Sequence, residues 1–357
     1  MQRLDNNVTS RVSILTPSFR RADLYPETFA SLRSQSYTDW EEIIVDDGSD
    51  PECLQRMQQI IRDEPRVTLL QRDREPKGAC TCRNLGVELC RGEYLIFLDT
   101  DDLLQAHCLA QRVAVMEQHP ELDLAIFPSE IFNEVPGDAA RWWNVETERD
   151  LLTRQFHQDA ICQGTGCIWR KSSFVKIGMW AEHLAIWQDI DLFLRAFIQD
   201  YKVKVCFDLP PDLLYREHDS LSRSGFYSRP KVESRCRVIR DAVRLLEECG
   251  KLNQKHLARF MVGETVYGAA RGRHFDLAND LLNWARDVTV LDSSEVRLLR
   301  RSVLACRSRM IRFSVVRNWI ESQLKTFHSV SLLGTVPKSE PLRRSKAGVG
   351  STGAASH

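Results

Sequence analysis

The chain has 357 residues, and its 49 Lys and Arg balance 49 Asp and Glu, so the formal net charge at pH 7 is zero. A general nucleic-acid binder needs a basic excess to neutralise phosphates, and the balance argues against that class. Hydrophobic residues make up 43% of the chain and charged residues 27%, which is typical of a globular protein with one large or two moderate domains. No apolar run reaches the length of a membrane span and the N-terminus lacks a secretory leader, so we expect the chain to stay in the cytosol.

The eleven cysteines are an odd number scattered over a long chain, which favours reduced thiols over a disulfide framework. Cys80 and Cys82 form one close pair, and Cys162 and Cys167 form a looser one. Together they could be four zinc ligands, but structural zinc sites usually space their cysteines as C-x2-C. We therefore favour small, buried apolar side chains at these positions.

The first hundred residues alternate short apolar runs with amphipathic stretches, which is typical of βαβ units and a mostly parallel sheet. Strands are predicted over 12–15, 42–45, 67–70 and 94–98, and helices over 24–35, 53–62 and 78–90. Polar loops follow the first, second and fourth of these strands. Because open α/β sheets bind ligands at the carboxyl ends of their strands, we expect the site at these loops.

The second half of the chain changes character. Further strands are predicted over 122–127, 167–170 and 203–207, a helix over 189–199, and later helices over 232–249, 253–270, 275–286 and 293–322. The polar region around Trp142 and Trp143 shows no pattern from which a helix or a strand can be predicted. Beyond residue 333, a tail rich in Gly, Ser and Lys is expected to be disordered.

Two clusters of acids follow buried strands. Asp46 and Asp47 end the second predicted strand, and Asp99, Asp101 and Asp102 end the fourth. Either cluster alone could be a turn with solvated carboxylates. Two clusters that converge at one sheet edge suit a hard divalent cation with a phosphate ligand, and oxygen ligands favour Mg2+ or Mn2+ over zinc.

Four ordered pieces of this half of the chain carry a resemblance. They read VSILTPSFRR at 12–21, SLRSQSY at 31–37, EIIVDDGSD at 42–50 and GEYLIFLDTDD at 92–102. In this order and spacing they resemble the opening of family 2 glycosyltransferases, which implies an α/β GT-A fold with a mostly parallel, Rossmann-like sheet flanked by helices. We therefore expect a transferase domain over 8–228, a helical C-terminal region over 229–332 and the tail over 333–357.

The resemblance implies a binding site for the donor nucleotide, made by Pro17, Ser18, Phe19, Asp47, Lys77, Arg83 and Asp99. The loop that begins at Pro17 would pack around the nucleotide base, and Asp47 would accept the base's imide N–H. Lys77 and Arg83 would lie near the base or its phosphates. Outside the motif, Lys77 would be interpreted as a solvated loop charge and Arg83 as a surface helix residue.

Asp99 and Asp101 match the family's D-x-D motif, whose second acid usually binds the metal that bridges the sugar diphosphate. The expected cofactor is Mn2+ or Mg2+. His218 lies in a segment that resembles the family's R-x-H-x-x-S-x-S ending, and it is either a further metal ligand or a solvated loop histidine. Arg216 could pair with the diphosphate instead.

Residues 187–195, WQDIDLFLR, resemble the family's E-D-x-D-L-x-x-R segment, whose first Asp is the expected general base. This makes Asp189 the candidate catalytic residue, although an acid at a helix N-terminus is also a common cap. Gln188 stands where the family usually has Glu, which puts acceptor binding and the pKa of the base in question. Asp191 is expected to pair with Arg195 four residues on.

The predicted function is inverting transfer of a sugar from a nucleotide-diphospho-sugar, with a UDP-sugar favoured, to an acceptor hydroxyl. The acceptor would be a carbohydrate or a lipid-linked molecule in polysaccharide, glycolipid or other glycoconjugate biosynthesis. The alternative is a noncatalytic nucleotide-sugar-binding module with the same fold, and fold alone does not decide between them. Five tryptophans between residues 140 and 190 suit either sugar rings or a core, namely Trp142, Trp143, Trp169, Trp180 and Trp187.

The last predicted helix is basic and amphipathic. It carries Arg297, Arg300, Arg301, Arg307, Arg309, Arg312 and Arg317 among apolar residues. Such a helix can lie on an anionic membrane, which would give a cytoplasmic protein a peripheral contact at the inner membrane face. A solvated face on a packed helix is the alternative.

Overall fold

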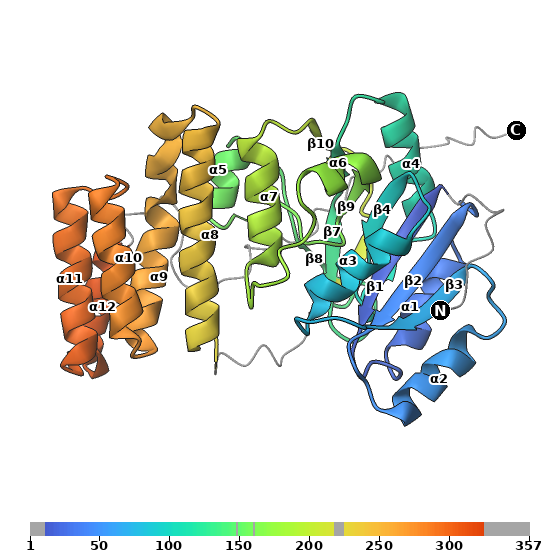
Figure 1. The fold of residues 1–357 in the computed structure, drawn as a ribbon, viewed down its shortest axis with the longest axis horizontal. Coiled ribbons are helices and arrows are strands. Elements are labelled where there is room, and N and C mark those ends of the chain that lie inside the picture. Colours follow the sequence, from blue (N-terminus) through green and yellow to red (C-terminus); the bar gives the residue numbers. More distant parts are fainter. Residues whose placement is uncertain (1–10, 148, 160, 218–224, 325–357) are drawn as a thin grey trace, which may run out of the picture.

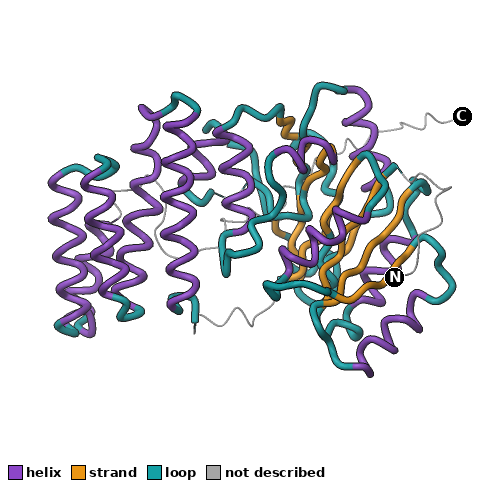
Figure 2. The backbone as a smooth tube through the Cα atoms, in the orientation of Figure 1, coloured by secondary structure: helices purple, strands orange, loops and turns teal. Residues whose placement is uncertain are grey.

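The computed structural model describes residues 11–147, 149–159, 161–217 and 225–324. A part built on β-sheets occupies one end of an elongated molecule, and an array of helices occupies the other (Figure 1). Figure 2 shows the strands gathered in the first part, with only helices and loops in the second.

The main sheet has seven strands in the order β10-β6-β9-β4-β1-β2-β3. They are β1 (Val12–Ser18), β2 (Trp40–Asp46), β3 (Val67–Gln71), β4 (Tyr94–Phe97), β6 (Leu124–Ile126), β9 (Cys167–Arg170) and β10 (Val203–Val205). All neighbouring pairs are parallel except those of β9, which runs antiparallel to both β4 and β6. The mostly parallel sheet predicted from the sequence is therefore present, with one reversed strand.

Helices cover both faces of this sheet. They are α1 (Tyr25–Arg33), α2 (Pro51–Ile61), α3 (Ala79–Leu89), α4 (Cys108–Gln118), α5 (Leu151–Phe156), α6 (Lys171–Lys176) and α7 (Gln188–Ile198). Side chains alternate between the faces along each strand. Accordingly, Ile14 packs with Leu109 of α4 on one face, and Leu15 packs with Val87 of α3 and Phe193 of α7 on the other.

A second, four-stranded sheet has the order β5-β11-β7-β8. Its strands are β5 (Leu103–Leu104), β7 (Ser129–Phe132), β8 (Arg141–Trp142) and β11 (Leu213–Arg216). β5 begins directly after the acid cluster at 99–102, so this small sheet fixes the far side of that loop. The unassigned segment around Trp142 is one of its edge strands.

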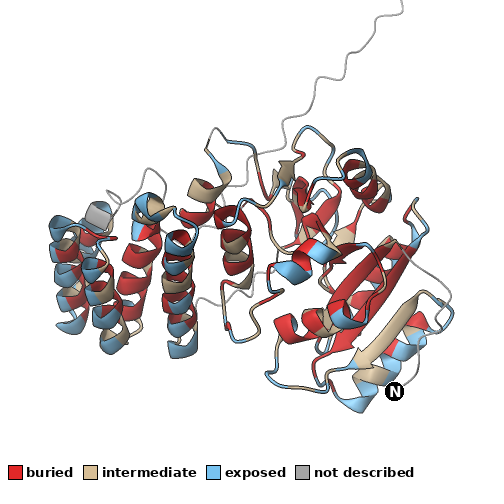
Figure 3. Ribbon diagram, turned by 45° about the horizontal axis from the view of Figure 1, so that its top comes forward, coloured by how far each residue is buried: buried red, intermediate tan, exposed pale blue. Residues whose placement is uncertain are grey.

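The helical part comprises α8 (Arg229–Glu248), η1 (Leu252–Ala258), α9 (Arg259–Arg271), α10 (Phe275–Asp287), α11 (Ser293–Arg307), η2 (Met310–Arg312) and α12 (Ser314–Leu324). The single helix predicted over 293–322 is wrong, because the chain breaks after Arg307 and Arg309 takes a left-handed conformation with φ of 62°. In Figure 3 the buried residues of these helices face their neighbours, and the outer faces are exposed. Among the described helices, none combines the length and apolar content needed to cross a bilayer.

Candidate functional site

The carboxyl ends of β2, β1 and β4 lie side by side, because β1 pairs in parallel with both neighbours. Ser18 ends β1, Asp47 follows β2, and Asp99 comes two residues after the end of β4. Val12 and Ile14 of β1 are fully buried, which fixes the register of this strand, the middle one of the three, in the core. The sheet thereby places the predicted donor loops along one edge.

Asp47 is only 8% exposed, yet its charge is compensated. Arg72 Nε donates to Asp47 Oδ1 at 2.6 Å, and the backbone N–H of Gly78 donates to the same oxygen at 3.1 Å. Gly78 has a φ of 143°, a left-handed conformation that glycine adopts without strain. Because these contacts all go to Oδ1, Oδ2 remains able to accept a hydrogen bond from a ligand.

Arg72 was missing from the sequence-based site. It is the first residue after β3, and β3 pairs with β2 so that Gln71 lies opposite Asp46. The next pair along the two chains is therefore Arg72 and Asp47. A correct prediction of strand pairing would have found this contact, whereas no local motif marks Arg72.

Phe19 and Lys77 approach each other beside Asp47. Lys77 Nζ lies 3.8 Å from the centre of the Phe19 ring, which is a cation–π contact, and Phe19 is 39% exposed. Ser18 is buried, and its carbonyl accepts a hydrogen bond from the Asp47 N–H at 2.8 Å. An exposed ring, a cation and a carboxylate thus lie together at this edge of the sheet, and we call this group the slot.

Arg83, Asp99 and Asp189 form a second group, although they come from α3, the loop after β4 and α7. Arg83 Nη2 lies 2.5 Å from Asp99 Oδ1, and the Arg83 guanidinium lies 5.0 Å from the centre of the Trp180 ring. The charges of Arg83 and Asp99 both act on the carboxyl of Asp189. The fold thus brings Asp99 and Asp189, two of the predicted residues, near the guanidinium of a third, Arg83.

Burial raises the pKa of Asp189 above the ordinary aspartate value. The backbone N–H of Ile190, which donates to Asp189 Oδ1 at 2.8 Å, and the charge of Arg83 lower the pKa but do not cancel the effect of burial. Trp187, just before α7, holds the left-handed conformation with φ of 67°, which is strained for a tryptophan. A strained residue two positions before a half-buried acid with a raised pKa is typical of functional sites.

Gln188 has a structural role in this loop, since its Nε2 donates to the Leu184 carbonyl at 3.0 Å. A glutamate could not donate that hydrogen bond. Asp191 pairs with Arg195 at 2.8 Å, which confirms the predicted contact. Arg195 also donates to the carbonyl of Ile177 at 2.7 Å, so this pair ties α7 to the turn before it.

The D-x-D loop contains a further acid, Asp102, which is buried. Asp102 is 2% exposed and accepts a hydrogen bond from the backbone N–H of Arg216 at 3.0 Å. Burial raises the pKa of Asp102 well above its ordinary value, and the negative charges of Asp99 and Asp101 raise it further. Asp101 lies 3.7 Å from Arg21 Nη2, a second arginine that the sequence-based site missed.

Arg216 does not point toward a free anion. Its guanidinium donates to the carbonyl of Asp101 at 3.0 Å and to Glu27 Oε2 at 2.6 Å, and it stacks on Phe132. These contacts give Arg216 a structural role, and its alternative role as a partner of the diphosphate stays a prediction. His218, the predicted further metal ligand, lies outside the described residues.

Across the described residues, no three His, Cys, Asp or Glu side chains form a cluster that could hold a metal ion. The cysteine-based zinc site is therefore absent from that part of the chain. Asp99 and Asp101 still fit Mg2+ or Mn2+, because such ions are often held by one or two carboxylates together with substrate phosphates and water. Burial is the main reason that the pKa of Asp102 is raised, and the negative charges of Asp99 and Asp101 add to it, so both carboxylates lie close to this one acid.

The tryptophans near the site lie mainly in the core. Trp169 is fully buried and Trp180 is 3% exposed, and both contact Phe174. Trp143 is 8% exposed and packs near Tyr215. Stacking on a sugar ring would need a more exposed face than these rings offer.

Comparisons with known proteins agree with this geometry. The sequence model of the family described as Glycosyl transferase family 2 matches residues 13–178. An uncharacterized glycosyltransferase of Haemophilus influenzae is 29% identical over 189 residues, which cover 52% of this chain and 61% of the relative. The matched part is therefore less than two thirds of that relative's length.

Two solved structures share the fold at low sequence identity. S. aureus TarS 1-349 in complex with UDP-GlcNAc superposes with a TM-score of 0.56 at 15% identity, over 88% of this chain and 91% of that one. The mannosyltransferase PcManGT of Pyrobaculum calidifontis, in complex with GDP-Man and Mn2+, gives a TM-score of 0.51 at 15% identity, over 89% and 84%. The sheet, the helices on its two faces and the family match lead to one conclusion: residues 13–178 belong to glycosyl transferase family 2, on the GT-A fold that the chain shares with these two structures.

Proposed function

We propose that the chain transfers a sugar from a nucleoside-diphospho-sugar to an acceptor hydroxyl, with inversion at the anomeric carbon. The observation that carries this proposal is the gathering of Asp99 and Asp189 around Arg83, next to the slot at Asp47. The UDP-GlcNAc bound to TarS supports a UDP-sugar as the donor. The acceptor would be a carbohydrate or a lipid-linked molecule in polysaccharide, glycolipid or other glycoconjugate biosynthesis.

The slot would bind the nucleotide base. Oδ2 of Asp47 would accept the imide N–H of the base, while Arg72 keeps the carboxylate ionised and oriented through Oδ1. Pro17, Ser18 and Phe19 would line the base, and Lys77 would turn from the ring of Phe19 toward a phosphate. These roles use only groups that already lie together.

The reaction requires a base near the acceptor. Asp189 would take the proton of the acceptor hydroxyl, and the oxygen would attack the anomeric carbon as the bond to the leaving diphosphate breaks. A raised pKa makes the ionised carboxylate a stronger base than an exposed aspartate. No covalent sugar intermediate is needed in this scheme.

Asp101, with Asp99 beside it, would hold Mn2+ or Mg2+, and His218 stays a prediction as a further ligand. When bound, the cation would supply positive charge that stabilises the leaving diphosphate. The Mn2+ in the PcManGT complex supports this assignment. We also propose that the reaction takes place on the cytoplasmic side of the cell.

The first test is a thermal-shift and calorimetric screen against UDP-, GDP-, dTDP- and CDP-sugars, each with and without Mn2+ or Mg2+. A ligand that binds only the folded state adds about 2.7 kcal/mol of stability at 100 times its dissociation constant. We expect metal-dependent stabilisation by one nucleotide sugar, and slow hydrolysis of that donor. Binding without hydrolysis or transfer would instead identify a noncatalytic nucleotide-sugar-binding module, and a flat response would contradict the proposal.

A further inference from the structure

The outer end of the helical array exposes a large apolar surface, which we call the terminal patch. It consists of Leu304, Met310, Phe313, Val315 and Trp319, which are 61%, 49%, 67%, 78% and 47% exposed. These side chains come from α11, the break after it and α12. Large apolar side chains are rarely grouped on a solvated surface without a binding role.

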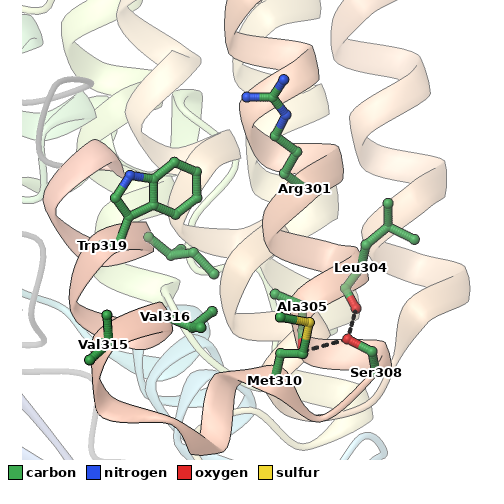
Figure 4. A pocket seen from close by; sticks show the side chains of 9 residues that line it. Arg301, Leu304, Ala305, Ser308, Met310, Val315, Val316 and Trp319 are labelled. Carbon is green, nitrogen blue, oxygen red and sulfur yellow. Dashed lines mark hydrogen bonds between the residues drawn. The ribbon is translucent and has the colours of Figure 1, made fainter.

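The terminal patch surrounds a hollow. Figure 4 shows Leu304 and Met310 on one side of it and Val315, Val316 and Trp319 on the other, with Arg301 at its rim. The cavity measures about 460 Å³. Water in such an apolar hollow lacks hydrogen-bond partners, so the hollow favours an apolar occupant.

The surroundings of the terminal patch are strongly basic. Residues 296–320 contain seven Arg and no Asp or Glu. Among the described residues, no acid forms an ion pair with Arg300, Arg301, Arg307, Arg309, Arg312 or Arg317, and all six are exposed. The occupant should therefore be anionic as well as apolar.

Charge argues against two occupants that the chain itself could supply. A second copy that docked through its own terminal patch would place one set of arginines against another, and such like-charge contact is unfavourable. The segment that follows, residues 325–357, has five Lys and Arg against one Glu, so it would also be repelled. A membrane with anionic lipids meets both needs, because it offers negative headgroups above an apolar layer.

We propose that the terminal patch docks on the surface of an anionic lipid membrane. Phe313, Val315 and Trp319 enter the headgroup boundary, and the surrounding arginines contact the lipid phosphates. The indole of Trp319 suits this boundary, since it has an apolar body and one N–H donor. This inference extends the proposed function, in that it would bring the site to a lipid-linked acceptor.

The distribution of charge gives the docking a direction. Residues 296–357 hold 12 of the 49 Lys and Arg but only 2 of the 49 Asp and Glu, so the rest of the chain carries a net negative charge. The α/β part lies at the opposite end of the long axis from α11 and α12 (Figure 1). An anionic surface therefore attracts one end of the molecule and repels the other.

Sedimentation of the full chain with vesicles tests the proposal without any sugar donor. We expect binding to vesicles of phosphatidylglycerol and phosphatidylcholine, weakened by high salt, and none to phosphatidylcholine alone. Arg312→Gln/Arg317→Gln should weaken binding about fivefold per arginine removed. Arg33→Gln/Arg62→Gln, which removes the same charge from α1 and from the residue after α2, should not weaken it.

The apolar contribution needs its own pair of variants. Phe313→Ser/Val315→Ser should weaken vesicle binding at least tenfold, while Val135→Ser/Val175→Ser, which alters exposed apolar residues elsewhere, should not.

Unchanged binding in both terminal-patch variants would overturn the proposal. So would a dimer in light scattering that these variants convert to monomers, because a second copy would then be the occupant. Donor binding in the calorimetric screen is read separately, so failure of the proposed function stays distinguishable.

Discussion

Burial raises the pKa of Asp189 at the N-terminus of α7, where the charge of Arg83 also reaches it. We expect Asp189→Asn to reduce kcat by about 10²- to 10⁴-fold, the usual contribution of a positioned general base. The affinity for the donor, measured by calorimetry, should stay the same, because the nucleotide slot is formed elsewhere.

Asp200→Asn is the matched control, since Asp200 follows the same helix but pairs with Lys251 and is exposed. It should leave kcat unchanged. In the unmodified chain, kcat should fall as pH drops through the raised pKa of Asp189, because the protonated acid cannot accept a proton. Full turnover in Asp189→Asn would place the base elsewhere.

Glu42 is a second buried acid with a pH-dependent consequence. It lies fully buried in β2 and accepts hydrogen bonds from the hydroxyls of Thr16 and Tyr25, each at 2.6 Å. Burial raises its pKa from 4.5 to about 7, so the folded chain holds this proton more tightly than the unfolded chain. The resulting stability is fully present below pH 4.5 and is lost as pH rises through 7.

We expect this group alone to lower the free energy of unfolding by about 3 kcal/mol between pH 4.5 and pH 8. Glu42→Gln should remove that slope and be more stable than the unmodified chain at pH 8. Urea denaturation at several pH values measures both effects, with Glu52→Gln on the exposed start of α2 as the control. Identical slopes in the two variants would contradict the burial argument.

The sequence marks most of the candidate site but not its supporting charges. Asp47, Asp99 and Asp189 stand in motifs, and they can be found without a structure. Arg72 reaches Asp47 only because of strand pairing, and Arg21 reaches Asp101 only because the fold of the first loop brings it there. A contact between distant segments leaves no local pattern, which is why sequence reasoning missed both.

At the scale of the elements, one buried ion pair joins the two sheets. Arg112 of α4 and Asp212, just before β11, are both fully buried and make two hydrogen bonds at 2.8 and 2.7 Å. Arg112 Nη1 also donates to the carbonyls of Thr165 and Cys167, which hold the chain at the start of β9. The pair therefore fixes how β11, and the loop at Asp102 that bonds to it, sit against the main sheet.

Asp212→Ala should destabilise the fold by about 3–5 kcal/mol, because it leaves a buried guanidinium without its counter-charge. Urea denaturation measures the loss. Asp276→Ala is the control, since Asp276 pairs with Arg229 at 2.7 Å on the surface, where solvent screens the pair, and its loss should destabilise the fold far less. The double variant Arg112→Met/Asp212→Leu should lose less stability than Asp212→Ala. A loss of stability as small as that of the control would show that the Arg112–Asp212 pair contributes little to the free energy of unfolding.

The elements of the first hundred residues were predicted better than the later ones, among which even α4, with eleven residues, was missed. The long strands and helices of the first hundred residues were found to within a few residues, for example β3 and α3, because their apolar pattern repeats. β5 and β8, with two residues each, carry no period and were missed. The break between α11 and α12 was also missed, since the arginines and apolar residues continue the helical pattern through it.

At the scale of the whole molecule, the core does not divide where the secondary structure changes. One apolar cluster contains Phe156 of α5, Leu194 of α7 with Trp187 just before it, and residues from α8 to α12 such as Val238 and Leu299. α8 also reaches back through Ser234, whose hydroxyl accepts the N–H of Ala185 at 2.8 Å. The sequence predicts a change to helices near residue 229, but periodicity gives no information on which elements share a core.

We therefore expect one cooperative thermal transition in calorimetry, with the calorimetric and van't Hoff enthalpies in agreement. An α/β part and a helical part that shared little surface would instead melt separately. Val238→Ala on α8 should lower that single transition as a whole. Two resolved transitions, with only the second shifted by Val238→Ala, would contradict a shared core.

Helix α7 packs in the core of the α/β part and in that of the helical part, and this has a consequence for the evolution of such proteins. The family match ends at residue 178, so α7 and its candidate base lie just beyond the matched segment, in contact with helices that carry no family signature of their own. Substitutions on the inner face of α8 can tilt α7 without touching a motif residue. Variation in an appended helical array is thus a route by which natural selection, or an engineer who builds chimeras, can retune the placement of the base while every motif stays intact.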